Sequence, residues 1–188
     1  MKNNQRIQKI ARLAMLTALS IVLVAFIQFP IFPAAPYLKY DPADVPILIA
    51  AFLYGPWYGV AVTALVSLIQ GFAMAGDGIV GAVMHFVATG AFCIVAGYIY
   101  KAHRTIKGAV VGLICGTCTM ALVMAGCNLV LTPIYTGMPR GEVAKMLVPV
   151  IIPFNLLKAG INSAVTFVVY KPVERLFGLK TEKIENRG

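Results

Sequence analysis

The segment Pro153–Asn162, PFNLLKAGIN, places one lysine, Lys158, inside an apolar stretch that predicts a helix. An ammonium group is costly to bury in hydrocarbon, so a lysine within a membrane normally faces a cavity or a partner. Asn155, Lys158 and Asn162 follow one another at i, i+3 and i+7 and therefore share one face of this helix. The segment thus predicts a transmembrane helix that carries a polar site.

The composition of the whole chain indicates a membrane protein. Of its 188 residues, 60% are hydrophobic and only 12% are charged, and the mean hydropathy is +0.84. No soluble domain of this size can bury so much apolar side chain, so we expect an integral membrane protein. The formal net charge of +9 does not indicate nucleic-acid binding, because the basic residues lie in short clusters that flank apolar segments.

The basic clusters predict the topology, because cytoplasmic loops carry an excess of Lys and Arg. Twelve such residues lie near the N-terminus, in one hinge and in the tail: Lys2, Arg6, Lys9, Arg12, Lys101, Arg104, Lys107, Lys171, Arg175, Lys180, Lys183 and Arg187. Placing these twelve inside leaves Lys39, Arg140 and Lys145 outside, and both termini are then cytoplasmic. The N-terminus also resembles a secretory signal, but its apolar stretch is long enough to span and its removal would make the span count odd.

Six apolar segments are predicted as transmembrane helices, at roughly 20 residues per span. They cover residues 10–29, 43–54, 57–75, 79–100, 108–131 and 146–170. The first ends before Pro30, because proline cannot continue a helix, and the short second segment meets the third at the uncharged turn Gly55-Pro56. We therefore expect an all-α membrane protein with one six-helix domain over residues 1–178 and a polar cytoplasmic tail over 179–188.

The cysteines and histidines do not form a pattern typical of a metal site. Cys115 and Cys118 make a C-x-x-C, but they lie in an apolar span without a second pair, so packed thiols are favoured over metal ligands. His103 lies in a basic inner loop, whereas His85 lies in an apolar helix and can either pack there or contact a ligand. We expect no bound metal.

Small residues at a spacing of four predict close contacts between helices. Gly108, Gly112 and Gly116 share one face of the fifth predicted span, which favours packing inside the bundle. Ala14 and Ala18 share one face of the first span in the same manner. For these alanines the alternatives are internal packing and a docking face for another membrane subunit.

Polar residues near the outer ends of the last two spans predict a pocket that opens outward. Asn128 lies near the outer end of the fifth span, and Asn155 and Lys158 lie in the outer half or middle of the sixth. The proline- and aromatic-rich connection 32–46 suits a cover over this pocket; the alternative is an interfacial loop in which Asp44 caps the second helix. Asparagine matches an amide or imide edge and lysine donates to a carbonyl, so we expect a mostly uncharged, partly aromatic ligand.

Over about residues 8–178 the chain resembles the substrate-binding S components of energy-coupling factor (ECF) vitamin importers, and among them the riboflavin-specific, RibU-like branch. The resemblance rests on four segments: 14–18 (AMLTA), 38–46 (LKYDPADVP), 128–135 (NLVLTPIY) and 153–158 (PFNLLK). It implies six helices with both termini inside, in agreement with the distribution of charge. It also implies the cell membrane of a prokaryote as the location and riboflavin as a transported ligand rather than a cofactor.

The resemblance further implies a set of functional residues. The implied substrate-binding residues are Leu38, Tyr40, Asp41, His85, Asn128, Asn155 and Lys158. Within this set, the two asparagines and the lysine would hydrogen-bond the flavin ring system, and the loop residues would close over it. The ribityl chain would be reached by His85 or, as the alternative, by Thr89. A transmembrane coupling subunit would dock on Ala14 and Ala18, and two ATPase subunits would drive uptake.

Other classes of function have less support in the sequence. The chain contains neither the phosphate loop G-x-x-x-x-G-K-[ST] nor a G-x-S-x-G nucleophile motif, so we expect a transport component and not an enzyme. Two alternatives to riboflavin transport stay open at this point. One is an S component for another vitamin, and the other is a small membrane scaffold in which the polar residues only join helices.

Overall fold

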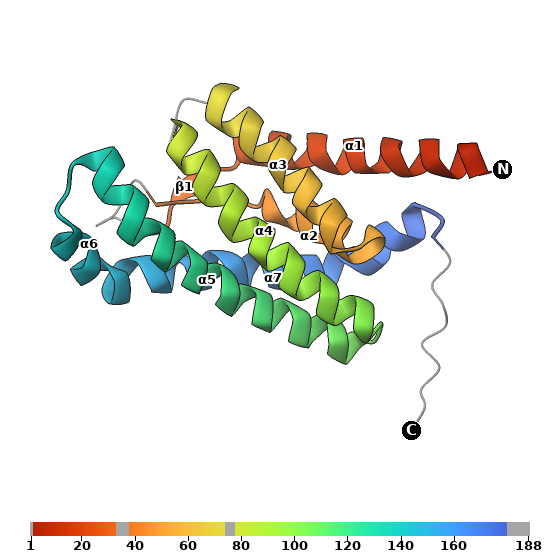
Figure 1. Ribbon diagram of the computed structural model, residues 1–188. Helices are drawn as coiled ribbons and strands as arrows, with labels where there is room; N and C mark the ends of the chain where they lie inside the picture. The colour runs from red at the N-terminus through yellow and green to blue at the C-terminus, as the bar shows by residue number, and fades with distance from the viewer. Residues whose placement is uncertain (1, 33–37, 74–77, 180–188) are drawn as a thin grey trace.

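The computed structural model describes residues 2–32, 38–73 and 78–179, and nearly all of its elements are helices (Figure 1). The α-helices are α1 (Lys2–Phe26), α2 (Asp44–Tyr54), α3 (Pro56–Ala73), α4 (Gly78–Ala102), α5 (Ile106–Thr136), α6 (Arg140–Met146) and α7 (Ile152–Leu176). A π-helix, η1 (Leu147–Ile151), joins α6 to α7, and the strands β1 (Phe29–Pro30) and β2 (Lys39–Tyr40) pair antiparallel. The expected helical architecture is confirmed, and the short pairing of β1 with β2 is a feature that the sequence did not predict.

Four helical segments in the described ranges are long and apolar enough to cross a membrane. They are Asn3–Phe26, Gly78–Ala102, Ile106–Thr136 and the joined segment Arg140–Leu176. The helices α2 and α3 are apolar but shorter. Large apolar side chains such as Phe26 and Val148 face outward, 83% and 74% exposed, as expected of a surface that lipid covers. The structure therefore agrees with a multi-pass membrane protein, while the count of six spans stays a prediction.

The short helix α2 lies at the centre of the bundle. It packs against α1, α3, α4 and α7, and its residues from Asp44 to Phe52 are all buried. Eleven residues at 1.5 Å each make α2 about 16 Å long, which is shorter than the helices around it. The surrounding helices therefore enclose space beyond the N-terminal end of α2.

The predicted glycine face brings α5 close to α4. A Cβ atom on Gly112 would lie 2.9 Å from the carbonyl oxygen of Ala96, and one on Gly116 would collide with the ring of Phe92. Both partners belong to α4, so these two glycines make the predicted helix contact. Gly108 instead faces the backbone of His103 in the turn between the two helices.

The last predicted span differs from a single helix over residues 146–170. The structure places α6 and η1 before α7, and α7 continues to Leu176. Within η1 the N–H of Ile152 bonds to the carbonyl of Leu147, five residues earlier. Pro149 and Pro153 lack the N–H that a regular α-helix requires, which favours this irregular turn. The expected third-span end at Ala75 and the tail beyond residue 179 lie outside the described residues.

Candidate functional site

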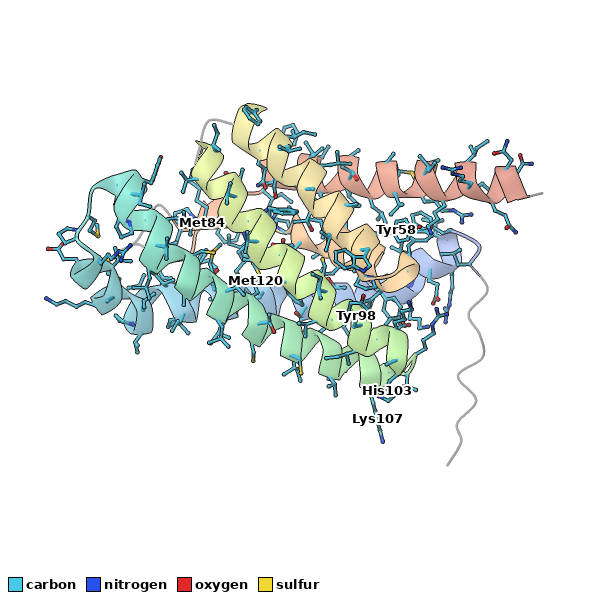
Figure 2. All side chains as sticks on the ribbon, viewed as in Figure 1. Tyr58, Met84, Tyr98, His103, Lys107 and Met120 are labelled. Carbon is cyan, nitrogen blue, oxygen red and sulfur yellow. The ribbon has the colours of Figure 1, made fainter. Side chains whose placement is uncertain are left out.

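A cavity of about 600 Å³ lies at the N-terminal end of α2, in the range typical of small-molecule sites. Its walls come from α1, the segment around β2, and the helices α3 to α7. Met84 and Met120, labelled in Figure 2, contribute apolar surface. Six of the seven predicted substrate-binding residues line it: Leu38, Asp41, His85, Asn128, Asn155 and Lys158. Residues from distant parts of the sequence thus meet at one site.

Tyr40 is the predicted residue that does not line the cavity. Its hydroxyl donates a hydrogen bond to Asn162 Oδ1 at 3.0 Å, and its ring lies 5.2 Å from that of Phe29. Burial raises the pKa of the Tyr40 phenol above its usual range, so the hydroxyl stays protonated and remains a donor. Tyr40 therefore holds the loop to α7, and the structure does not place its ring against a ligand in the cavity.

Lys158 forms a buried ion pair with the loop before α2. Its Nζ lies 2.7 Å from Asp41 Oδ2, and both side chains are about nine-tenths buried. The other oxygen of Asp41 accepts the backbone N–H of Ala43 at 3.1 Å. A buried ammonium is stabilised by a close carboxylate with further hydrogen bonds. The polar wall of the cavity therefore carries a fixed pair of opposite charges, which the sequence analysis did not predict.

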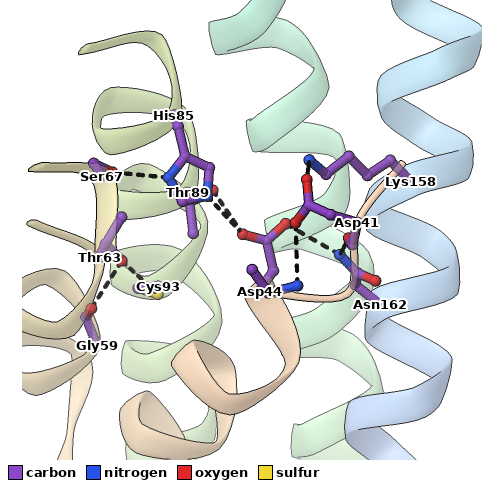
Figure 3. A network of polar contacts seen from close by, with 11 residues as sticks. Asp41, Asp44, Gly59, Thr63, Ser67, His85, Thr89, Cys93, Lys158 and Asn162 are labelled. Carbon is purple, nitrogen blue, oxygen red and sulfur yellow. Dashed lines mark hydrogen bonds and ion pairs between the residues drawn. The ribbon is translucent and has the colours of Figure 1, made fainter. Parts of the chain in front are cut away.

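Asp44 is the centre of a polar network that includes the cavity residue His85 (Figure 3). Its Oδ1 accepts hydrogen bonds from His85 Nε2 at 3.1 Å and Thr89 Oγ1 at 3.0 Å, and its Oδ2 accepts one from Asn162 Nδ2 at 3.1 Å. The suggestion that Asp44 caps α2 is wrong, because the capping residue is Ala43 and no side chain among the described residues caps that end. The carboxylate joins α2 to α4 and α7 instead.

Asn162 connects this network to the loop. Its Nδ2 also donates to the backbone carbonyl of Asp41 at 3.1 Å, while its Oδ1 accepts from Tyr40. Since one amide bonds two loop residues and Asp44, it fixes the loop against α7. The network therefore positions the ion pair between Asp41 and Lys158 at the cavity wall.

His85 lines the cavity, but both of its ring nitrogens already bind protein groups. Nε2 donates to the Asp44 carboxylate, and Nδ1 lies 2.8 Å from Ser67 Oγ. When Nε2 alone carries the ring hydrogen, Nδ1 accepts the Ser67 hydroxyl hydrogen. The expected contact between His85 and ribityl hydroxyls is untested, and the ring nitrogens are not free to make it without a rearrangement.

The two predicted asparagines differ in how their amide oxygens are used. Asn128 donates to the carbonyl of Met124 at 2.8 Å, and its Oδ1 accepts from Thr132 at 3.0 Å. Asn155 donates to the carbonyl of Ile151 at 2.8 Å, but its buried Oδ1 has no hydrogen-bond partner among the described residues. An unpaired buried acceptor costs about 1–3 kcal/mol, so Asn155 is well suited to receive an N–H from a ligand.

Gln70 on α3 is a cavity residue that the sequence analysis missed. Its Oε1 is buried and also has no hydrogen-bond partner in the part of the chain that the structure describes. The signal available in the sequence was one glutamine in the otherwise apolar run Leu68-Ile69-Gln70-Gly71-Phe72.

The described residues contain no group of three or more His, Cys, Asp or Glu side chains that could hold a metal ion.

The predicted docking alanines lie on the outer face of α1. Ala14 and Ala18 are exposed, whereas Leu16, Ser20 and Val24 are buried. The helix thus packs on the bundle through another face, and the two alanines do not contribute to internal packing. Their role in binding another subunit stays a prediction.

Residues 8–170 match the family described as the ECF transporter, substrate-specific component. The chain belongs to this family. It is an S component, the part of a transporter that binds the substrate, and not an enzyme. This membership confirms the resemblance drawn from the sequence.

Related proteins and structures agree with this assignment. The S component is 34% identical over 145 residues to the riboflavin transporter FmnP of Bacillus subtilis (strain 168), which covers 71% of this chain and 75% of that protein. It is 36% identical over 142 residues to the riboflavin transporter RibU of Staphylococcus aureus (strain TCH60), covering 72% and 74%. A solved S component of a bacterial ECF transporter superposes with a TM-score of 0.78 at 33% identity, covering 94% and 98% of the two chains. An S component for biotin, at 18% identity and a TM-score of 0.62, shares the fold alone.

Proposed function

We propose that this S component binds riboflavin and mediates its uptake together with an ECF energy-coupling module. The observation that carries the proposal is the cavity of about 600 Å³, which Asn128, Asn155 and Lys158 line together with Leu38 and Asp41. The similarity to riboflavin transporters over some seven-tenths of the chain supports the choice of ligand. Small-molecule recognition of this kind needs an apolar enclosure with a few placed polar groups.

The polar wall matches the pyrimidine-like edge of a flavin. That edge carries an imide N–H between two carbonyl groups, so it needs one acceptor flanked by donors. The unpaired Oδ1 of Asn155 supplies the acceptor, and Lys158, one helical turn further on, supplies a charged donor. The ion pair with Asp41 fixes the position of the ammonium group, so the donor is held in place before the ligand arrives.

The remaining walls suit the apolar rings of the flavin. Met84, Met120 and Met124 line the cavity from α4 and α5. Thioether groups are polarisable and pack favourably against aromatic rings. Leu38 lines the cavity from the loop side. The proposed contacts of the ring system are therefore polar along one edge and apolar over the faces.

The finer topology and the partners belong to the same proposal. Residues 1–178 form one domain of six spans in the cell membrane, in which α2 and α3 are the short second and third spans. Both termini are cytoplasmic, which is supported by the twelve basic residues that this arrangement places inside. A transmembrane coupling subunit binds α1 at Ala14 and Ala18, and two ATPase subunits supply the energy. The exposed position of the two alanines supports this docking face.

The test is an absorption and fluorescence measurement on the chain purified in detergent. We expect a flavin spectrum with quenched emission, or saturable one-to-one quenching when riboflavin is added. A colourless protein that leaves the emission of added riboflavin unchanged would contradict the proposal. A panel of other vitamins, assayed by calorimetric titration, would then identify the substrate.

A further inference from the structure

We infer that Gln70 recognises the hydroxylated side chain of the ligand and so distinguishes a flavin that carries a polyol from one that does not. This inference rests on the proposed function, because it assumes that a flavin ring occupies the cavity. It adds a specificity-determining residue on the wall of the cavity formed by α3, where no contact with the flavin ring is predicted. The predicted ring contacts come from the loop, α4, α5 and α7, whereas Gln70 belongs to α3.

The environment of Gln70 points to a missing partner. Three apolar side chains of α3 point outward, where lipid is expected. They are Leu68, Ile69 and Phe72, which are 55%, 36% and 75% exposed. Gln70 lines the cavity instead, and its buried Oε1 accepts no hydrogen bond from any described residue. An amide oxygen kept from both water and protein donors is unfavourable. A donor on a bound ligand would remove this penalty.

The packing of the helices separates Gln70 from the residues proposed to hold the ring. The helix α3 packs against α1, α2 and α4, whereas α7 packs against α2, α5 and η1. Gln70 and the pair Asn155 and Lys158 therefore lie on different walls of one cavity. A ligand whose polar ring edge binds α7 can reach α3 only through another part of the molecule. For riboflavin the remaining polar part is the ribityl chain.

The chemistry of a primary amide fits a chain of hydroxyl groups. The amide presents one acceptor and two donor hydrogens side by side, and each hydroxyl both donates and accepts. His85, a polar residue of α4 that lines the same cavity, already uses both ring nitrogens for Ser67 and Asp44. Gln70 therefore lines the cavity with an uncommitted amide oxygen, which a rotation of the side chain amide can turn toward a ligand, and it does so without adding a charge.

The experiment compares riboflavin with lumiflavin, which has the same ring system but a methyl group in place of the ribityl chain. Gln70→Leu removes the amide while nearly keeping the volume, and Gln70→Ala serves as a second variant. The control is Gln8→Leu, the same change on the exposed N-terminal part of α1. Each protein is titrated with each flavin in detergent, and the dissociation constants are obtained from fluorescence quenching.

We expect both Gln70 variants to lose roughly tenfold or more in riboflavin affinity, while lumiflavin affinity stays within about twofold and Gln8→Leu changes neither. Unchanged riboflavin affinity would overturn the inference. Equal weakening of both flavins would also overturn it, because it would give Gln70 a merely structural role. Retained lumiflavin binding shows that a variant is folded. Failure of the unaltered chain to bind either flavin is a separate result, which would refute the proposed function itself.

Discussion

The central position of Asp44 leads to a prediction about stability. Asp44→Ala removes a carboxylate that is fully buried and that accepts hydrogen bonds from side chains on α4 and α7. In this variant the Asn162 amide still donates to the backbone carbonyl of Asp41, so the loss of its bond to Asp44 costs little free energy. His85 Nε2 and Thr89 Oγ1 lose the acceptor that the structure gives them.

The size of the effect follows from these two unpaired donors. At about 1–3 kcal/mol for each unsatisfied buried group, Asp44→Ala lowers the free energy of unfolding by about 2–6 kcal/mol. Asp44→Asn keeps one carbonyl oxygen for His85 and Thr89, but it turns an amide toward Asn162, which is itself a donor. We expect the free energy of unfolding of this variant to lie between those of Asp44→Ala and the unaltered chain.

The measurement is an equilibrium unfolding titration with sodium dodecyl sulfate in mixed micelles, followed by circular dichroism without ligand. The matched control is Glu174→Ala, which removes a carboxylate paired with Lys171 at 2.9 Å on the last turns of α7. That pair is partly exposed, and pairs of this kind contribute less than about 1 kcal/mol. If Asp44→Ala and Glu174→Ala unfold at the same detergent fraction, the assignment of Asp44 as the centre of the network is wrong.

Three further predictions concern binding, assembly and packing. Asn155→Ala weakens riboflavin binding by about 1–3 kcal/mol in a quenching titration. The control Leu156→Ala changes an outward-facing side chain and leaves the affinity unchanged. Equal affinities of the two variants would contradict the role of the Asn155 amide. Ala14→Trp retains riboflavin binding but prevents co-purification with the coupling module, and loss of binding would instead place this residue in internal packing. Gly116→Val costs about 1–3 kcal/mol of stability because the added side chain collides with a ring of α4, whereas Gly126→Ala, with open space around it, should be neutral.

The helices could be predicted well where apolar runs are bounded by glycine, proline or charge. The predicted spans 43–54 and 79–100 correspond to Asp44–Tyr54 and Gly78–Ala102. The fifth span was predicted to end at Leu131, but α5 continues through Pro133 to Thr136 and ends at Gly137, whose φ of 72° is a left-handed helix cap. Local sequence did not show that the surrounding structure accommodates a proline there.

The site was predictable in its residue types but not in its pairing. Helical spacing alone placed Asn155 and Lys158 on one face, because that spacing is a local property of the chain. The bond between Lys158 and Asp41 joins residues 117 positions apart, and the bond between His85 and Asp44 joins residues 41 positions apart. Such contacts depend on the packing order of the helices, which no motif in a single sequence specifies. Gln70 was missed for the same reason, since only the fold directs it into the cavity.

The π-helix η1 makes one place in the chain tolerant of a change in length. A π turn holds one residue more than an α turn, so deletion of Pro149 from η1 can shorten this turn to an α turn and leave Asn155 and Lys158 in position. A deletion between Asn155 and Lys158 would instead rotate one relative to the other by about 100°. Single-residue insertions and deletions among related chains should therefore collect at η1, and sequence alignments through this segment should carry a gap there rather than within α7.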